Sequence, residues 1–177
     1  MAINSFETQL SGGHPNSLGN TVAVVDEVLK DKKKLKDLYN CYQSEDEVVR
    51  LRVSSAKKRV CIAKPEWLAG YLDGLLSDIS QIDQASTKWT LALLFRLLDT
   101  LMSDVQRKKA IQIMKTNLLR DKDWIVQNTT AESLEYFARN DKNLTIWFMP
   151  ELTKMKKNKH KSVAHRAIKI LNNLKKK

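Results

Sequence analysis

Residues 44–64 read SEDEVVRLRVSSAKKRVCIAK, and this stretch decides the fold class. Its apolar residues recur with the spacing of a single α-helical face: Val49, Val53, Ala56 and Val60. Acidic residues precede them, where the free amide groups at the start of a helix favour negative charge. Pro65 follows, and proline disfavours helix at the residue before it. The stretch therefore predicts one amphipathic helix with defined ends.

The same apolar spacing continues on both sides of this helix. Five glycines and three prolines are few for 177 residues, so long runs pass without a strong helix breaker. The expected helices cover residues 17–31, 35–43, 47–64, 65–79, 84–102, 105–119, 124–138, 143–156 and 162–174. No stretch has the alternating pattern of a strand. The sequence predicts an all-α fold, preceded by a flexible arm over residues 1–16 that is rich in turn residues.

Every second expected helix repeats a pattern of small and apolar residues. Anchors placed at Val49, Trp89, Val126 and Val163 are separated by 40, 37 and 37 residues. Small or apolar residues occupy most positions four, five, eight and eleven residues after each anchor, with Lys57 and Thr100 as the poorest fits. Helix pairs with such a period bury their apolar faces by stacking on one another. The period therefore predicts a right-handed α-α superhelix, or solenoid.

Three of the anchor segments resemble HEAT repeats of the armadillo-like solenoid family, as found in short bacterial HEAT-repeat proteins. They read Glu47-Val48-Val49-Arg50, Asp123-Trp124-Ile125-Val126 and Lys161-Ser162-Val163. Pro150 is similar to the proline that often bends the first helix of a HEAT unit. Arg50 is the only arginine directly after an anchor, which departs from the family pattern. The resemblance implies a fold and a tendency to bind macromolecules, and it implies no reaction.

The resemblance covers four repeats, at about 33–62, 65–102, 104–138 and 142–174. The helix over residues 17–31 would cap the first repeat. One solenoid domain over residues 17–177 is therefore expected.

The net charge of +11 is concentrated at one end of the chain. Residues 154–177 contain ten Lys or Arg and no Asp or Glu, whereas the rest of the chain carries 21 basic and 20 acidic residues. Such a surface attracts phosphates or an acidic partner, or it merely keeps an exposed end solvated. The candidate basic binding surface comprises Arg50, Lys57, Arg96, Lys154, Lys156, Lys157, Lys159, Lys161, His165, Arg166 and Lys169.

No pattern typical of catalysis, of a metal site or of a cofactor site occurs in the sequence. His160 and His165 are five residues apart and would face different sides of a helix, so they could not share a metal from one face. Cys41 and Cys61 form no CxxC pair and are expected to be small buried side chains in a reducing compartment. The chain is therefore expected to be a non-enzyme without cofactors.

Two functions remain open on the sequence. The first is a non-catalytic scaffold or adaptor that engages a macromolecular partner on a concave helical face, a protein first of all, with nucleic acid as a further partner through the basic C-terminal repeat. The alternative is a nucleic-acid-binding module related to HEAT-like DNA alkylation-repair proteins, with glycosylase activity as its extreme form. In that alternative, Trp89 and Trp124 would be groove aromatics that stack on bases. A polar N-terminus and the lack of a membrane span predict a cytoplasmic location, and an exposed apolar edge would allow a homodimer.

Overall fold

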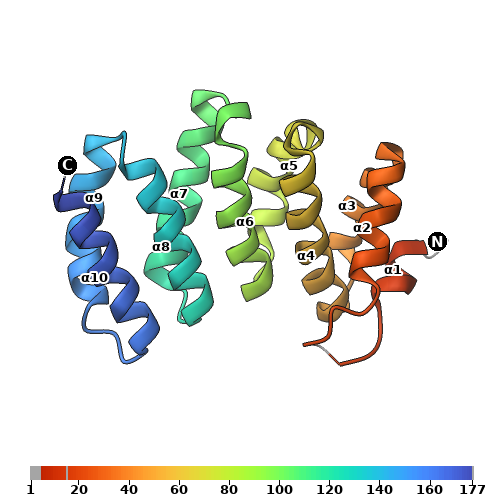
Figure 1. Cartoon of the computed structure of the whole chain (residues 1–177), viewed down its shortest axis with the longest axis horizontal. Coiled ribbons are helices and arrows are strands. Elements are labelled where there is room, and N and C mark those ends of the chain that lie inside the picture. The colour runs from red at the N-terminus through yellow and green to blue at the C-terminus, as the bar shows by residue number, and fades with distance from the viewer. Residues whose placement is uncertain (1–4, 15, 177) are drawn as a thin grey trace. The chain divides into compact units, whose positions relative to one another are not determined.

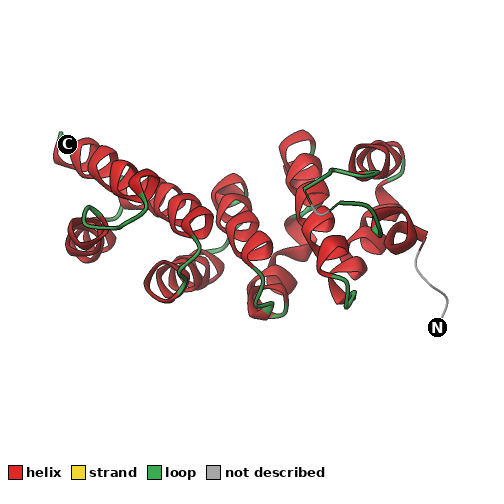
Figure 2. Ribbon diagram, turned by 90° about the horizontal axis from the view of Figure 1, so that it is seen from below, coloured by secondary structure: helices red, strands yellow, loops and turns green. Residues whose placement is uncertain are grey.

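The computed structural model describes residues 5–14 and 16–176, and every regular element in this part of the chain is a helix. The all-α prediction is therefore confirmed. The described residues form ten α-helices joined by short loops and 3-10 turns. Figure 1 shows their order along the chain, and Figure 2 shows the same chain from below. The chain divides into two compact units, Met1–Thr90 and Leu91–Lys177, where a single domain was expected. Each unit is described separately.

The N-terminal unit is built around one long helix, α4. Its elements are α1 (Ser5–Leu10), α2 (Thr21–Lys30), η1 (Lys32–Lys34), α3 (Leu35–Asn40), η2 (Cys41–Gln43), α4 (Glu47–Ala63), η3 (Pro65–Trp67), η4 (Ala69–Tyr71), α5 (Leu72–Ser77), η5 (Ile79–Gln81) and the start of α6 (Ala85–Leu97). Helix α4 packs against α1, α2, α3 and η2. The carboxylate of Asp46 caps α4 by accepting the amide of Val48 at 2.7 Å, as the acidic start predicted.

The C-terminal unit consists of two helix pairs. After the end of α6 and η6 (Asp99–Leu101) come α7 (Asp104–Arg120), α8 (Trp124–Ala138), α9 (Lys142–Met155) and α10 (Lys161–Lys175). Helix α8 packs against α7, α9 and α10, so the two pairs stack through their second helices (Figure 1). Helix α9 continues through Pro150, as expected from the sequence. A capping box between Ser103 and Gln106 begins α7, and Asp123 begins α8 by accepting the amides of Ile125 and Val126.

The burial pattern places one of the four repeat anchors at a different residue from the one that the sequence predicted. Val49, Val126 and Val163 are fully buried and each is the third residue of its helix. The third residue of α6 is Thr87, which is also fully buried, whereas Trp89 is partly exposed. The anchor at Trp89 was therefore wrong by two residues. Because α6 is apolar on most faces, hydrophobic pattern alone could not fix its phase.

With Thr87 as the anchor, the same positions are buried in α4, α6 and α8. The positions four, five and eight residues later in α6 are buried (Leu91, Ala92 and Phe95), and so is the eleventh, Leu98, directly after the helix. The anchors are then 38, 39 and 37 residues apart, a more even period than the sequence alone suggested. Thr87 fits this position because its methyl group packs like that of a valine, although its hydroxyl has no hydrogen-bond partner in the described chain.

The expected arm over residues 1–16 is partly helical and packed. Residues 1–4 and 15 lie outside the described part, but α1 buries Phe6 and Leu10 almost completely. The loop after α1 is held by Arg52 of α4, which is only 2% exposed. The Arg52 guanidinium donates to five backbone carbonyls: Leu10 and Gly12 at 2.6 Å, Ser17 and His14 at 3.2 Å, and Ser11 at 3.3 Å. This clasp could not be predicted from the sequence, because its acceptors are backbone atoms.

Candidate basic surface of the C-terminal unit

The loop between α9 and α10 carries a dense group of exposed lysines. Lys156, Lys157 and Lys159 lie in or beside the loop, and Lys161 is the first residue of α10. No carboxylate of the described chain forms an ion pair with any of these four. Lys154, one turn earlier, pairs with Glu151 at 2.8 Å but its side chain is 72% exposed. Five of the predicted surface lysines therefore come together in this loop region.

An exposed tryptophan adjoins the lysine loop. Trp124, the first residue of α8, is 43% exposed, and its ring is nearly parallel to that of His160, with 18° between the planes and 6.3 Å between the centroids. His160 precedes the first residue of α10. The two meet because α8 and α10 pack side by side in the same register, with Val126 and Val163 buried at equivalent positions. The predicted aromatic Trp124 is thus at the surface, next to the predicted lysines.

Side-chain hydrogen bonds hold the loop against α8. The Asn158 amide donates to Gln127 Oε1 at 3.0 Å, and its own oxygen accepts the His160 backbone amide at 2.9 Å. Asn128 donates to the Ser162 hydroxyl at 3.2 Å. These contacts fix the position of the lysine loop relative to Trp124. His160 and Asn158 were not among the predicted site residues, although the 37-residue period makes Lys161, which follows His160, equivalent to Trp124.

Two carboxylates lie near this surface, and both accept backbone amides. Asp123 caps α8, and Asp121 accepts the amide of Asp123 at 2.8 Å. Their charge lowers the local excess of positive charge. A shallow hollow of about 210 Å³ adjoins the loop and is lined in part by Leu119, Lys154 and Asn158.

We refer below to Trp124, His160 and the lysines at 156, 157, 159 and 161 as the basic surface.

Other predicted basic residues of the C-terminal unit are divided between paired and exposed positions. Glu132 of α8 accepts ion pairs from Arg96 at 3.1 Å and Arg166 at 3.3 Å, which reduces the net charge of that helical face. His165 and Lys169 of α10 are exposed. Lys177, the last of the three lysines at positions 175–177, lies outside the described residues. The charge available to a ligand is thus concentrated at the loop rather than along the second helices.

In the N-terminal unit, Arg50 is used to connect structural elements. Its guanidinium donates to the Gln84 side chain at 2.7 Å and to the carbonyl of Ser44 at 2.5 Å. Trp89 lies with Leu51 between two open hollows of about 350 and 370 Å³. Lys58 borders the larger hollow. Trp89 therefore contributes to a surface of the N-terminal unit, while Trp124 belongs to the C-terminal unit.

The placement of Lys57 in a basic surface was wrong, because its side chain is fully buried. Its Nζ lies 4.5 Å from the ring centroid of Tyr39 and 4.4 Å from that of Tyr71, and it has no hydrogen-bond partner in the described chain. Burial lowers the pKa of the Lys57 ammonium to about 7, and the two rings oppose this by stabilising the cation. The polar character of lysine had suggested a surface position, and only its place in the repeat pointed to the core.

The two cysteines are buried in the same unit as Lys57. Neither forms a disulfide in the described chain, and burial raises the pKa of Cys41 to about 12 and that of Cys61 to about 11. A thiol is a good nucleophile only as the thiolate. Neither cysteine therefore has the environment of a catalytic nucleophile.

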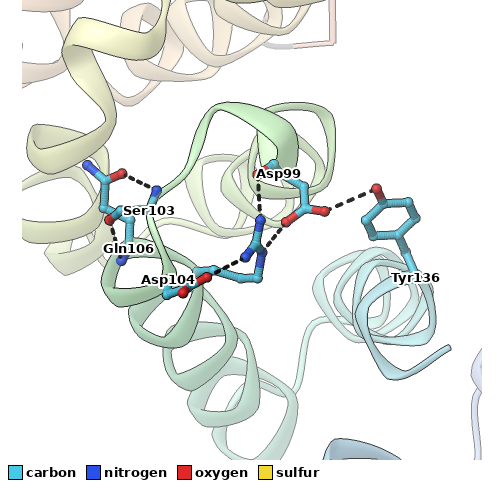
Figure 3. Close-up of polar contacts among 6 residues, drawn as sticks. Asp99, Ser103, Asp104, Gln106 and Tyr136 are labelled. Atoms are coloured by element: carbon cyan, nitrogen blue, oxygen red, sulfur yellow. Dashed lines mark hydrogen bonds and ion pairs between the residues drawn. The ribbon is translucent and has the colours of Figure 1, made fainter. Parts of the chain in front are cut away.

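A polar cluster in the C-terminal unit ties η6, α7 and α8 together (Figure 3). Asp99 accepts Arg107 Nε at 2.5 Å and the Tyr136 hydroxyl at 3.2 Å. Arg107 also donates to Asp104 at 2.9 Å. An open hollow of about 480 Å³ lies beside the cluster, and two of the charged groups that line it, Asp99 and Arg107, are paired with each other. This cluster therefore acts as a structural connection between helices.

The described residues contain no group of three or more His, Cys, Asp and Glu side chains placed to hold a metal ion. None of their helices combines the length and the apolar character needed to cross a membrane.

Comparisons with known protein families, with characterised proteins and with solved structures find no match to this chain.

Proposed function

We propose that the chain is a non-catalytic module of HEAT-like helical repeats that binds nucleic acid through the basic surface of the C-terminal unit. The observation that carries this proposal is the group of four lysines without ion pairs in the segment whose His160 stacks against an exposed tryptophan. Phosphates are attracted to such lysines, because binding releases the counterions that the nucleic acid had condensed. The indole adds a planar apolar face on which a base can stack.

The repeat register supports the solenoid part of this proposal. All four second helices, α4, α6, α8 and α10, bury their third residue, and three of them bury the same four later positions. Such a register is typical of repeat units that stack in order. Within the C-terminal unit, the two pairs α7–α8 and α9–α10 stack in this way.

Titration by fluorescence anisotropy with labelled oligonucleotides tests the binding function. Wild-type protein is expected to bind at about 50 mM salt and to lose about tenfold or more of its affinity at about 200 mM, because several phosphate contacts release counterions. The triple variant with Lys156, Lys157 and Lys159 changed to Gln should bind more weakly. It should also show a salt slope smaller by about two, in the plot of log affinity against log salt.

A matched control changes three exposed lysines of the N-terminal unit, Lys30, Lys33 and Lys36, to Gln. This control lowers the net charge by the same amount and should retain most of the affinity and the salt slope. Equal losses in both variants would mean that total charge, not the basic surface, governs binding. If wild type binds no oligonucleotide at the lower salt, the nucleic-acid function is wrong, and the chain is better explained as a scaffold for a protein partner.

A further inference from the structure

We propose that the basic surface is selective for single strands, with Trp124 as the platform on which an unpaired base stacks. This inference rests on the nucleic-acid binding proposed above and specifies its ligand. It states which form of nucleic acid the surface prefers. The lysines alone would not decide this preference, because they attract the phosphates of single strands and of duplexes.

The position of Trp124 sets it apart from a core residue. The side chain is at the first position of α8, and the chain buries Val126 two residues later, yet 43% of the indole remains exposed. The Asp123 cap and the hydrogen bonds of Gln127 and Asn128 fix the backbone around it. The indole is therefore held in place without being covered, which reduces the entropy lost when a ligand binds.

His160 stacks against Trp124. Its ring lies 18° from parallel to the indole, with 6.3 Å between the centroids, which is the kind of contact that a nucleic-acid base also makes with an aromatic ring. Lys159 and Lys161 flank His160 in sequence, and neither has an ion pair in the described chain. Bases stacked on the rings would thus have their phosphates within reach of cations.

A duplex cannot use this arrangement well. Its bases are already stacked and paired, and a flat indole at a helix terminus can reach a base face only if the base is unstacked. The lysines would still attract duplex phosphates, so duplex binding is expected to be weaker rather than absent.

The experiment compares three labelled ligands of equal length in the same buffer: a single-stranded oligonucleotide, an abasic strand with the same phosphates, and a duplex. Wild type should bind the single strand more tightly than the abasic strand by about 5- to 100-fold, the range expected for one stacked base. Trp124→Ala should bring the single strand to the affinity of the abasic strand. Trp124→Phe should keep part of the preference, because a phenyl ring also stacks.

Ile146→Ala is the matched control, since Ile146 is 62% exposed on α9 of the same unit and lies outside the basic surface. It should behave as wild type, and circular dichroism should show all variants to be helical. Wild type that binds the abasic strand or the duplex as tightly as the single strand would overturn the inference, as would a Trp124→Ala variant with unchanged preference. In both cases salt-dependent binding would leave the proposed function intact, whereas the loss of all binding would refute that function itself.

Discussion

Eight residues after the anchor, three second helices bury a large apolar side chain: Phe95, Leu134 and Leu171. Helix α4 has Lys57 at this position, equally buried and without a carboxylate partner. The two tyrosine rings beside its ammonium compensate only part of the lost hydration. Lys57 is therefore expected to destabilise the N-terminal unit relative to the leucine that the repeat calls for.

Replacing Lys57 with Leu should stabilise the protein most at and below about pH 7. The folded-state pKa is lowered from 10.5 to about 7, so the unfolded chain binds more protons between these values. Wild-type stability should therefore rise with pH over this window, whereas Lys57→Leu should lose that part of the rise. Urea unfolding near pH 6.5 and pH 9.5 should show a gain of about 1–4 kcal/mol at the lower pH and a smaller one at the higher.

A control for this measurement is Lys58→Leu, the neighbouring residue on the partly exposed side of α4. It should change neither the stability nor its pH dependence by more than about 0.5 kcal/mol. If Lys57→Leu destabilises the protein at both pH values, the ammonium contributes net stability, and the two rings outweigh the desolvation.

At the scale of helices, the sequence predicted most elements because their apolar residues follow one face. Helices α4, α8 and α10 have clear stripes and capping or boundary residues, and their ranges agree closely with the prediction. The segment expected as one helix over 65–79 is instead divided into η3, η4 and α5. Gly70 and Gly74 lie in this segment, and glycine weakens a helix interior. Gly74 also leaves room for the Tyr39 hydroxyl, which a Cβ would strike.

The candidate site was predictable only in part, for a similar reason. The lysines near the end of the chain and Trp124 were visible as a charge run and an aromatic residue. The contact of Trp124 with His160 depends on the packing of α8 against α10, and the burial of Lys57 on the packing around α4. Such contacts between distant residues have no local sequence signal.

The carboxylate of Asp99 connects η6 to α7 and α8, so its removal is expected to weaken the packing of these three elements. Asp99→Ala removes the partner of Arg107 and the acceptor of Tyr136. It should lower the free energy of unfolding by about 2–4 kcal/mol, because both bonds are lost and Arg107 is left with only Asp104 as a carboxylate partner.

Tyr136→Phe is the comparison for Asp99→Ala, since it removes one hydrogen bond and keeps the ion pair. It should cost about 1 kcal/mol. Chemical denaturation of both variants measures the difference. Equal effects would mean that the ion pair between Asp99 and Arg107 contributes nothing to the connection.

At the scale of the whole molecule, the N-terminal segment is part of a packed unit. It covers one side of α4 with α1, α2 and the loop that Arg52 holds. An expected flexible arm is therefore part of the first unit.

A chain shortened to begin at Asn20 tests this role of the N-terminal segment. It lacks all five carbonyl acceptors of Arg52, so the guanidinium would lose its partners, at a cost of about 3–5 kcal/mol where it stays buried. Arg52→Leu should destabilise the full chain but stabilise the shortened one. Thermal unfolding of the four proteins measures this reversal as a double-mutant cycle. If Arg52→Leu changes the stability in the same direction in both chains, the five carbonyls are not what compensates for the burial of the Arg52 guanidinium.

The Arg52 clasp also affects how freely this part of the sequence can change over evolution. Its acceptors are backbone oxygens, which any amino acid supplies, so most side chains of the loop are left without a required partner. Only the backbone shape is demanding: Gly12, Gly13 and Gly19 have φ values of +70°, +72° and +50°, and a Cβ at Gly19 would meet the guanidinium. Descendants of this protein could therefore keep the clasp with one arginine and a few glycines while all other residues of the loop were replaced.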